Sequence, residues 1–535
     1  MTAFDYVIVG AGAAGCAIAA RLTEDPAVTV CLLEAGGDGR SALIRAPAGI
    51  ALLLPTRLHN WAYKTVPQKG LNGRRGYQPR GKALGGSSAI NAMLYVRGHR
   101  WDYDHWSTLG NRGWSYEEVL PFFRRAENNE VFDGPYHGKG GPLNVAAQLN
   151  PSSLNAQFLA AAALNGIPNI ADCNGESQPG SLMYQVTQRN GERCSAARAY
   201  LEPNRARSNL EVLTGATCAK LLFDAGRATG VAYYAGSSGS LAEVRARREV
   251  VLCAGAFGSP QLLMLSGIGP AEELARHGIA VRRHLPGVGR NLQDHIDYIQ
   301  SYRAPGDSDT IGLSPRGLAR IARGVLEWRR TRTGLITTVF AESGAFLMSS
   351  PEIEVPDLQL IFVIGIADDH NRRLHLGHGF SCHVTVLRPL SRGAVTLRSA
   401  DPRAGPLIDP AFLQDERDLA LLMRGARIQR AILESKPFDP YRGAMLYPVA
   451  KGDERALEQD IRNRADTQYH PSGTCKMGPD GDPMAVLDPQ LRVRGVGGLR
   501  VADASIMPTL IGGNTNAPSV MIGEKAAEMI RAAPA

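Results

Sequence analysis

The stretch DYVIVGAGAAGCAIAARLTEDPAVTVCLLE, residues 5–34, decides the fold of this chain. An apolar run meets a glycine-rich turn, an alanine-rich segment follows, and a second apolar run ends at an acidic residue. This order predicts a strand, a helix and a parallel strand, which together form a βαβ unit. We therefore expect an α/β protein with a Rossmann-type domain.

Three glycines in the turn have separate tasks in a dinucleotide-binding unit. Gly10 permits the tight turn, Gly12 lets the backbone approach a pyrophosphate, and Gly15 lets the helix pack closely on the strand. The helix N-terminus offers unpaired N–H groups to phosphates. Glu34, about 20 residues further on, is placed to accept hydrogen bonds from ribose hydroxyls. A dinucleotide site is predicted, with a purely structural turn as the alternative, and NAD and FAD are not distinguished.

Composition argues against several classes of protein. The 535 residues carry 59 basic and 51 acidic side chains, for a net charge of +8, and 44% of them are hydrophobic. This is typical of a globular protein, and no basic block predicts binding to nucleic acid. The densest basic segment is Arg316 to Arg332. We interpret it as an amphipathic helix with a solvated basic face, and a membrane or anionic-partner surface is the alternative.

The sequence also carries signals about localisation. No basic-then-apolar leader precedes Asp5, and no apolar run approaches the ~18 residues that a spanning helix needs. The eight cysteines form no CxxC pair, and we expect them to be reduced. A cytoplasmic protein is therefore expected, with peripheral membrane association left open. The sequence does not predict an oligomeric state.

A second glycine-rich stretch lies at residues 81–98, GKALGGSSAINAMLYVRG. Its core of Gly85, Gly86, Ser87 and Ser88 offers consecutive N–H groups and hydroxyls to an anion, with a glycine-rich surface loop as the alternative. This stretch resembles the first signature of the glucose-methanol-choline (GMC) flavoprotein oxidoreductases. The matching positions are Gly81, Lys82, Leu84, Gly85, Gly86, Ser87, Ser88, Ile90, Asn91, Tyr95, Gly98 and Asp104.

A second signature of the same family is similar to residues 255–269. The matching positions are Gly255, Ala256, Ser259, Pro260, Leu262, Leu263, Ser266, Gly267, Ile268 and Gly269. The resemblance spans essentially the whole chain and implies FAD, in place of NAD, at the first motif.

The resemblance also implies which residues contact FAD. Besides the glycines, Ser87 and Glu34, it indicates Asn91, Leu94, the backbone of Cys218, and Asp503 beside the ribityl and pyrophosphate groups. Ile90 stands where certain choline-oxidising members carry a histidine that bonds FAD covalently. We therefore expect FAD to be bound non-covalently.

Element patterns and the resemblance together predict two interleaved domains, α+β over the whole chain. The FAD-binding domain is expected to comprise residues 1–150, 193–295 and 485–535. An inserted substrate-binding domain is expected to comprise residues 151–192 and 296–484, and to carry the catalytic histidine. Its predicted form is an antiparallel sheet backed by helices.

Periodicity predicts the main elements of both domains. The expected helices lie within 105–129, at 153–166 and at 416–435. The expected strands lie at 209–224 and 248–257, with three successive strands between 357 and 399.

The catalytic residues implied by the resemblance lie near the end of the sequence. In TQYHPSGTCKMG, residues 467–478, His470 matches the family's catalytic histidine, with a structural histidine as the alternative. A neutral imidazole, with an ordinary pKa of about 6.5, can take the proton of an alcohol. The family supplies a second histidine or asparagine, which is Asn514 here. An amide is no base, so Asn514 is expected to donate to the developing alkoxide.

The resemblance further implies that the last helix points its N-terminus at the flavin pyrimidine, where its dipole favours the reduced, anionic flavin. Asn516 is expected to cap this helix and also to contact the cofactor.

Two other kinds of site, a metal site and a serine hydrolase site, are not supported by the sequence of the substrate domain. Asp368, Asp369, His370, His375 and His378 match no recognised metal spacing, so we expect a solvated loop and no metal site. No GxSxG elbow is present for a serine hydrolase.

Glu342 resembles a position where choline-oxidising relatives place a carboxylate for the quaternary ammonium group. Other alcohol-oxidising relatives carry an acid in a similar context. Glu342 is therefore a candidate substrate-contact residue, and choline is one alternative substrate.

The resemblance implies FAD-dependent oxidation of a primary alcohol to an aldehyde, with hydride transfer to flavin N5 and His470 as the base. Bacterial alcohol and choline dehydrogenases are the closer likeness, which favours a quinone-type acceptor over oxygen. The alternatives are an oxygen-using aryl or aliphatic alcohol oxidase, a choline dehydrogenase, and a lyase or fatty-acid photodecarboxylase using the same FAD. A non-catalytic flavin carrier is disfavoured because His470 and Asn514 are both present. The individual alcohol is not predicted.

Overall fold

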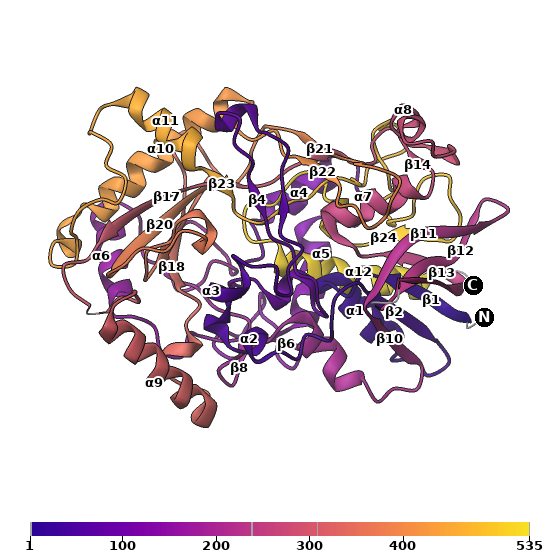
Figure 1. The fold of residues 1–535 in the computed structure, drawn as a ribbon, viewed down its shortest axis with the longest axis horizontal. Helices are drawn as coiled ribbons and strands as arrows, with labels where there is room; N and C mark the ends of the chain where they lie inside the picture. The colour runs from indigo at the N-terminus through magenta and orange to yellow at the C-terminus, as the bar shows by residue number, and fades with distance from the viewer. Residues whose placement is uncertain (1–2, 237–238, 308, 534–535) are drawn as a thin grey trace.

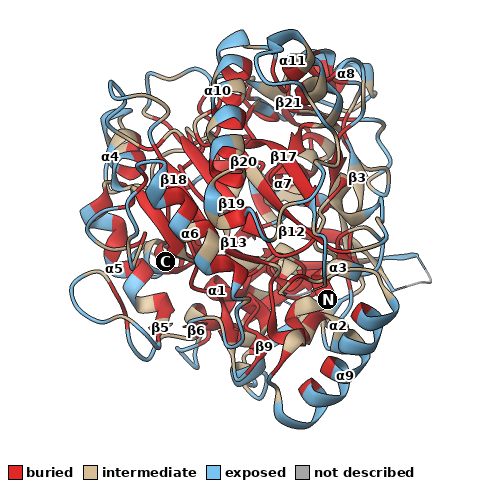
Figure 2. Ribbon diagram, turned by 90° about the vertical axis from the view of Figure 1, so that its left-hand side faces the viewer, coloured by how far each residue is buried: buried red, intermediate tan, exposed pale blue. Residues whose placement is uncertain are grey.

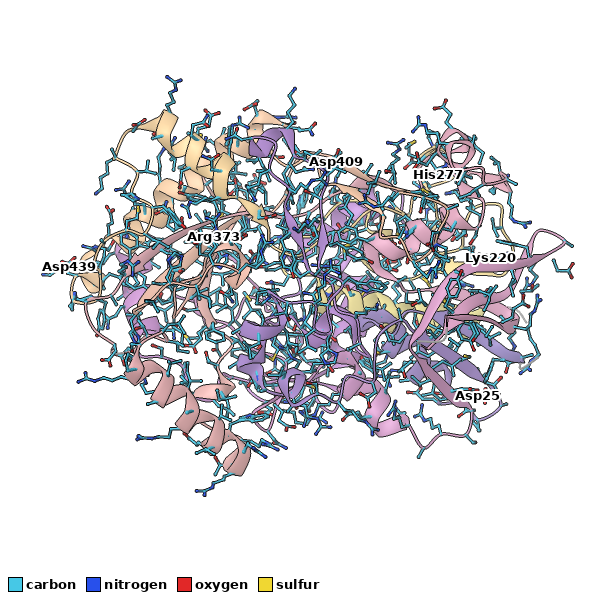
Figure 3. All side chains as sticks on the ribbon, viewed as in Figure 1. Asp25, Lys220, His277, Arg373, Asp409 and Asp439 are labelled. Carbon is cyan, nitrogen blue, oxygen red and sulfur yellow. The ribbon has the colours of Figure 1, made fainter. Side chains whose placement is uncertain are left out.

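The computed structural model describes residues 3–236, 239–307 and 309–533. Two large sheets lie side by side along the long axis of the molecule (Figure 1). Side chains fill the space around both sheets (Figure 3). In the described part of the chain, no helix is both long and apolar enough to cross a bilayer.

The first sheet contains the predicted βαβ unit. β1 (Ala3–Val9) pairs in parallel with β2 (Val30–Glu34) on one side and with β13 (Ser240–Leu252) on the other. The strand order is β10-β2-β1-β13-β12-β11, and β24 also pairs with β13. The other strands of this sheet are β10 (Leu210–Thr214), β11 (Ala216–Asp224), β12 (Arg227–Ala235) and β24 (Leu499–Val501).

Helix α1 (Ala13–Leu22) follows the glycine turn and packs against α12 (Asn516–Ala532). Almost all of its residues are buried, because small side chains allow close packing on both sides. A Cβ on Gly523 of α12 would lie 2.6 Å from the Ala14 carbonyl oxygen. The last helix of the chain is thereby held against the first, and its N-terminus lies near the glycine turn.

The second sheet is antiparallel, with the order β23-β17-β20-β19-β18-β7. Its strands are β7 (Gly180–Met183), β17 (Ile296–Arg303), β18 (Ala341–Leu347), β19 (Leu358–Val363), β20 (Gly379–Val386) and β23 (Asp466–Thr467). Helices α6 (Leu154–Leu164) and α10 (Glu416–Leu433) pack on it. The predicted antiparallel sheet backed by helices is confirmed.

Strand alternation gives the second sheet two different faces. On β19, Leu358, Leu360 and Phe362 belong to the core under the helices, whereas Ile361 and Val363 line a cavity on the opposite face. The sheet therefore forms one wall of that cavity.

The remaining helices and strands are shorter or lie at the edges. The helices are α2 (Ala42–Arg45), α3 (Ile50–Leu53), α4 (Arg100–Thr108), α5 (Tyr116–Ala126), α7 (Gly255–Leu265), α8 (Ala271–Arg276), α9 (Pro315–Thr331) and α11 (Glu454–Arg464). The strands are β3 (Tyr63–Lys64), β4 (Tyr77–Gln78), β5 (Glu127–Asn129), β6 (Leu143–Val145), β8 (Gln188–Arg189), β9 (Glu192–Arg193), β14 (Ile268–Gly269), β15 (Arg283–His284), β16 (Arg290–Leu292), β21 (Gly393–Thr396) and β22 (Leu407–Asp409).

The last of the three strands predicted between 357 and 399 was expected in the large antiparallel sheet, and that expectation is wrong. It forms β21, which pairs with β16 and β22 in a separate three-stranded sheet. The carboxylate of Asp418 on α10 accepts hydrogen bonds from the N–H groups of Leu390 and Ser391, at 2.7 and 2.8 Å. This contact turns the chain away from the large sheet before β21 begins.

The helix predicted at Arg316 to Arg332 is confirmed as α9. Its buried residues, Gly317, Gly324 and Trp328, form one narrow side, and Arg320 also donates to the Asp307 carbonyl oxygen at 2.8 Å. Figure 2 shows it standing out from the body with most of its surface exposed.

The strands of each large sheet fall within the predicted domain segments. Strands of the first sheet lie in 1–150, 193–295 and 485–535, and those of the second lie in 151–192 and 296–484. The domain boundaries themselves stay a prediction.

Candidate active site

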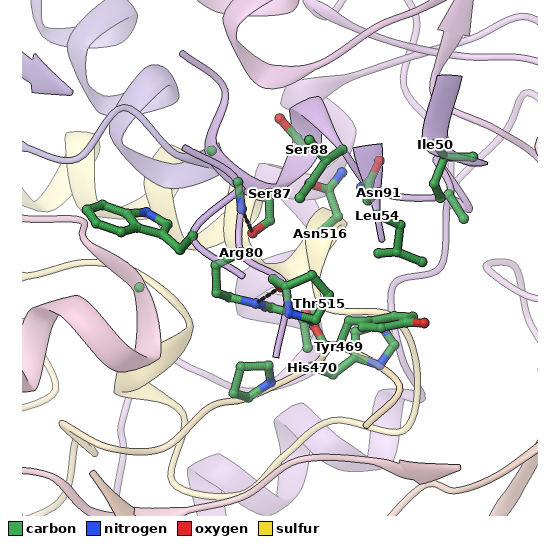
Figure 4. Close-up of a pocket in the computed structure, with 18 of the residues that line it drawn as sticks. Ile50, Leu54, Arg80, Ser87, Ser88, Asn91, Tyr469, His470, Thr515 and Asn516 are labelled. Atoms are coloured by element: carbon green, nitrogen blue, oxygen red, sulfur yellow. Dashed lines mark hydrogen bonds between the residues drawn. The ribbon is translucent and has the colours of Figure 1, made fainter. Parts of the chain in front are cut away.

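A cavity of about 580 Å³ connects the glycine turn after β1 with the second sheet. Both large sheets contribute to its lining, together with the N-terminus of α12. Figure 4 shows part of this lining, in which Ser87 and Asn91 of one segment lie with His470 and Asn516 from two segments far away in the sequence.

The glycine turn has the geometry that the sequence predicts. Gly10 has φ +101°, and a Cβ on it would lie 2.5 Å from the Cys253 carbonyl oxygen. A Cβ on Gly15 would lie 2.1 Å from the Gly10 carbonyl oxygen, so α1 can approach β1 only without a side chain there. Gly12 lines the cavity, and a Cβ on it would meet nothing closer than 3.8 Å. Gly12 thus leaves room for a ligand against bare backbone.

Glu34 lines the same end of the cavity. Its carboxylate accepts hydrogen bonds from Ala11 N–H at 3.1 Å and Gly36 N–H at 2.8 Å. Burial raises the pKa of Glu34 to about 7. The carboxylate is fixed at the end of β2, where a ribose hydroxyl pair could donate to it.

The second glycine-rich stretch lies against the first. A Cβ on Gly86 would lie 2.8 Å from Gly12 Cα, so the two turns touch backbone to backbone. Gly86 and Ser87 line the cavity. Gly85 is not among the lining residues; it has φ +94° and donates its N–H to the Ala11 carbonyl oxygen at 2.7 Å. Its expected cofactor contact is therefore corrected to a supporting role behind the cradle.

The other cofactor residues implied by the resemblance also line this cavity. These are Asn91, Leu94, Cys218, Asp503 and Asn516. The carboxylate of Asp503 accepts from the N–H of Gly255 and the hydroxyl of Ser259, at 2.8 and 2.6 Å, and burial raises its pKa.

The prediction that Asn516 caps the last helix is wrong by one residue. α12 begins at Asn516, so Thr515 occupies the capping position, and neither residue makes a side-chain cap hydrogen bond. The free N–H groups of the first turn are consequently available on the side where Asn514, Thr515, Asn516 and Ser519 line the cavity.

His470 and Asn514 come together at the end of the cavity nearest the second sheet. Asn514 Nδ2 lies 3.2 Å from His470 Nε2, and Asn514 Oδ1 accepts from Gln359 Nε2 at 3.3 Å. Because the amide oxygen is engaged by Gln359, the amide N–H₂ group faces the imidazole.

A third residue, His295, completes this arrangement and was not predicted from the sequence. Its Nε2 donates to the Leu387 carbonyl oxygen at 2.9 Å, which leaves its Nδ1 as an acceptor. His470 Nδ1 lies 2.9 Å from that acceptor and donates to it. The hydrogen bonds therefore assign the proton of neutral His470 to Nδ1 and leave a lone pair on Nε2.

Burial keeps both imidazoles neutral. It lowers the pKa of His295 to about 3. Burial, with His295 and the Arg80 guanidinium nearby, holds the pKa of His470 well below its ordinary value. No spacing rule links residues 295 and 470, since 175 residues separate them, so only the fold reveals the pair.

The backbone of His470 is held by Asp294, the residue before His295. Asp294 Oδ1 accepts from His470 N–H at 2.9 Å, and Oδ2 accepts from Thr467 and Gln78 at 2.6 and 3.0 Å. Arg80 donates to the Tyr469 carbonyl oxygen at 2.7 Å. These contacts fix the loop that presents the imidazole.

The cavity beyond His470 is mainly apolar. Its apolar lining there consists of Ile299, Ile311, Leu313, Ile321, Val339, Phe340, Ile361, Val363, Ile366 and Leu374. The polar residues His370, Asn371, His375, His383 and Gln468 also line the cavity. Among the described residues that line the cavity, the carboxylates are Glu34 and Asp503, both at the end near the glycine turn.

Glu342 does not line the cavity, and its expected contact with a substrate is wrong. It is fully buried, and its carboxylate accepts from Asn155 Nδ2 at 2.6 Å, Thr338 Oγ1 at 2.7 Å and Ser152 N–H at 2.8 Å. Asn155 belongs to α6, so Glu342 points from β18 toward the helices and away from the cavity.

The expectation of a solvated loop at residues 368–378 is also wrong in part. His370 lines the cavity and lies 2.7 Å from the Tyr469 hydroxyl and 3.1 Å from Asp466. His375 pairs with buried Asp368 at 2.7 Å. Separate partners hold these histidines, and in the described part of the chain no three metal-ligating side chains converge on one point.

Comparisons with known proteins identify the family. Models of the GMC oxidoreductase family match residues 4–297 and 389–523. The chain belongs to the GMC oxidoreductases. It is therefore an oxidoreductase that acts on CH–OH donors.

Similar proteins extend over nearly the whole chain. An alcohol dehydrogenase [acceptor] of Pseudomonas putida is 44% identical, with 98% of this chain and 95% of the relative covered. Mitochondrial choline dehydrogenase of Homo sapiens is 43% identical, with 99% and 90% covered. Pyridoxine 4-oxidase from Mesorbium loti has a solved structure with a TM-score of 0.88 at 33% identity, covering 98% of each chain.

The residues of the cavity fit the FAD that the family implies. Gly12 leaves open space over bare backbone, the turns of Gly10 and Gly86 meet beside it, and the cavity continues without a break to His470. Such a continuous space allows the adenine half of FAD to bind at the glycine turn and the flavin to reach the imidazole.

Proposed function

We propose that this GMC oxidoreductase oxidises a primary alcohol carried on an apolar chain to the corresponding aldehyde, with His470 as the general base. The observation that carries the proposal is the His295–His470–Asn514 arrangement, which leaves His470 Nε2 unprotonated, with the Asn514 amide as its hydrogen-bond donor at the cavity wall. Bound FAD would supply the acceptor for the hydride that leaves the alcohol carbon.

The proton and the oxygen are handled by different side chains. A substrate hydroxyl that lies beside His470 Nε2 and Asn514 Nδ2, and replaces the hydrogen bond between them, can donate to the imidazole and accept from the amide. As the proton moves to Nε2, His470 becomes a cation, and its Nδ1–H stays bonded to His295. The amide N–H₂ of Asn514 then stabilises the negative charge that develops on oxygen.

The apolar lining beyond His470 determines the preferred substrate. An aliphatic chain can be buried there, at about 0.8 kcal/mol for each CH₂ group. Among the residues that the structure describes, none offers a carboxylate to a quaternary ammonium ion in that region, because Glu342 faces α6 and the lining acids lie at the cofactor end. An apolar alcohol is therefore favoured over choline.

We propose a quinone-type electron acceptor. This rests on the similarity to a relative named alcohol dehydrogenase [acceptor] at 44% identity, against 33% for the pyridoxine 4-oxidase. An oxygen-using reaction is the second candidate, because an oxygen-dependent choline dehydrogenase of Brucella ovis is 43% identical over 98% of this chain.

Anaerobic mixing with a panel of alcohols tests both parts of the proposal. We expect the yellow flavin to bleach fastest with long-chain alkanols, more slowly with aryl alcohols and slowest with choline. Addition of a quinone should then restore the yellow colour of the flavin faster than addition of air. Bleaching by choline alone would contradict the apolar substrate, and absence of bleaching by every alcohol would contradict alcohol oxidation.

FAD should be released when the protein is denatured. Ile90 lines the cavity where a covalent link would need a histidine, and a hydrocarbon side chain cannot form one. After acid precipitation we expect the yellow chromophore in the supernatant, measured by its absorbance. Colour that stays in the pellet would contradict non-covalent binding. The variant Ile90→His, treated identically, shows whether the position can support a link.

A further inference from the structure

The outer end of the cavity is formed by three segments that also reach the surface. They are residues 50–54 with α3, residues 311–321 leading into α9, and residues 365–377. Leu374 lines the cavity although 74% of the residue is exposed. The cavity therefore opens to solvent beside Leu374.

Large apolar side chains are exposed on the segments that form this opening and on the residues that follow them in the chain. Those exposed on the same three segments or directly next to them are Leu52, Leu58, Leu318, Val325, Leu326, Leu374 and Leu376. Single exposed apolar residues are ordinary, but a group around one opening forms a patch that marks an interaction site. We call this set the apolar rim.

Contacts between the segments hold the rim together. Leu313, just before α9, bridges to Leu376 and Gly377. Trp328 of α9 packs with Ala46, which lies just before α3. The three segments therefore form one continuous edge of the cavity.

Helix α9 has three distinct faces. Gly317, Gly324 and Trp328 rest on the body of the protein. At 100° per residue, a second face carries the exposed apolar residues Pro315, Leu318, Ala319, Ala322, Val325 and Leu326, together with Arg329 near the C-terminal end. The third face carries Arg316, Arg320, Arg323 and Arg330, with Glu327 as its one acidic residue. Figure 3 shows the side chains of this helix projecting outward.

Arg320 donates to the Asp307 carbonyl oxygen at 2.8 Å, whereas the other arginines of the third face are available to a partner. In the described part of the chain, no carboxylate lies within ion-pair distance of Arg320, Arg323 or Arg330. Arg316 has one long contact, 3.9 Å to Asp307, and its side chain is largely exposed. An apolar face beside unpaired arginines is typical of helices that lie in the interface of a bilayer.

We propose that α9 and the apolar rim dock this protein on an anionic lipid bilayer. The leucines enter the boundary between headgroups and acyl chains, and the arginines of α9 contact lipid phosphates. The inference goes beyond the proposed function, since docking needs no turnover. It would let apolar alcohols and lipid-soluble acceptors enter the cavity from the bilayer.

The charge on α9 favours a bilayer over a second copy of this chain. A twofold dimer places the same patch of both copies face to face. The unpaired arginines of the two α9 helices would then oppose each other at short range, whereas anionic headgroups neutralise them.

Sedimentation with lipid vesicles tests the proposal on the FAD-loaded full-length protein. We expect binding to vesicles of phosphatidylglycerol and phosphatidylcholine, much weaker binding to phosphatidylcholine alone, and weakening as salt rises. A protein that stays in the supernatant with both vesicles would overturn the proposal.

The arginines are tested by the triple variant Arg316→Gln, Arg323→Gln, Arg330→Gln. Each arginine near an anionic surface strengthens binding about fivefold, so the triple variant should bind about a hundredfold more weakly. A control of equal charge replaces three exposed arginines on other elements, Arg276, Arg403 and Arg417, by glutamine. Equal losses in the two variants would show that net charge alone attracts the protein, and would overturn a specific surface.

The apolar face is tested by Leu318→Gln with Leu326→Gln, which are 56% and 63% exposed. The matched control is Leu164→Gln with Leu241→Gln, on α6 and β13, which are 69% and 56% exposed. We expect at least a tenfold loss of vesicle binding in the first variant only. Flavin absorbance and turnover of a short soluble alcohol should be unchanged in both.

Light scattering on the same samples tests the alternative that a second copy of this chain covers the apolar rim. If the protein ignores vesicles but forms a dimer that Leu318→Gln with Leu326→Gln dissociates, the rim is a contact between copies and the proposal is wrong.

Discussion

Replacing His470 by alanine should slow anaerobic flavin reduction by alcohol by about 100- to 10,000-fold, because the group that takes the hydroxyl proton is removed. Asn514→Ala should cost less, since the amide stabilises charge but accepts no proton in this scheme. Stopped-flow mixing at saturating alcohol measures both rates. FAD absorbance per protein serves as the control for folding. Near-normal reduction by His470→Ala would disprove the assignment of the base.

The pH dependence of the wild-type protein gives an independent check on the same base. Burial and the neighbouring Arg80 lower the pKa of His470, so the imidazole stays neutral and active down to a lower pH than an exposed histidine would. The rate should therefore be level between about pH 7 and 8 and fall only below the ordinary value of about 6.5. A fall that begins above pH 7 would contradict a lowered pKa.

Replacing His295 by phenylalanine should slow flavin reduction by about 10- to 100-fold. The substitution removes the acceptor at 2.9 Å from His470 Nδ1, which leaves a buried N–H without a partner at a cost of about 1–3 kcal/mol. His470 can then place its proton on Nε2, where it is no longer a base toward the substrate.

The variant His295→Asn is the matched control for the phenylalanine variant. An asparagine oxygen can occupy the place of Nδ1 and accept from His470, so this variant should retain more of the rate. The loss in His295→Phe should appear in the maximal rate of reduction and not in the apparent affinity for alcohol. Equal rates in the two variants would show that His295 only fills space.

Local sequence patterns were sufficient for the cofactor half of the molecule. Gly10, Gly12 and Gly15 act over a few residues, and their backbone requirements are independent of distant contacts. The same holds for the elements of the second sheet, since alternation along β19 predicts which residues face the helices. The motif around His470 identified a histidine that the fold brings next to Asn514.

Patterns failed where a side chain's direction depends on a neighbouring element. Glu342 matched a family position by local context, but β18 turns it toward Asn155 of α6. The local pattern of residues 393–396 predicts another strand of the large sheet. The hydrogen bond from Leu390 N–H to Asp418 of α10 turns the chain away before that strand, which joins a separate sheet. In both cases a distant hydrogen bond decides between outcomes that the local sequence allows equally.

The sequence by itself predicted the βαβ unit and the dinucleotide site, because each depends on residues that are close together in the chain, and its family resemblance proposed His470 as the base. Tertiary structure alone decided the rest of the site. It placed His295 against His470 across 175 residues and so selected the tautomer of the base. It also gathered three separate segments into one apolar cavity mouth. Such contacts follow from how sheets and helices pack, and that packing joins residues for which the chain shows no common spacing.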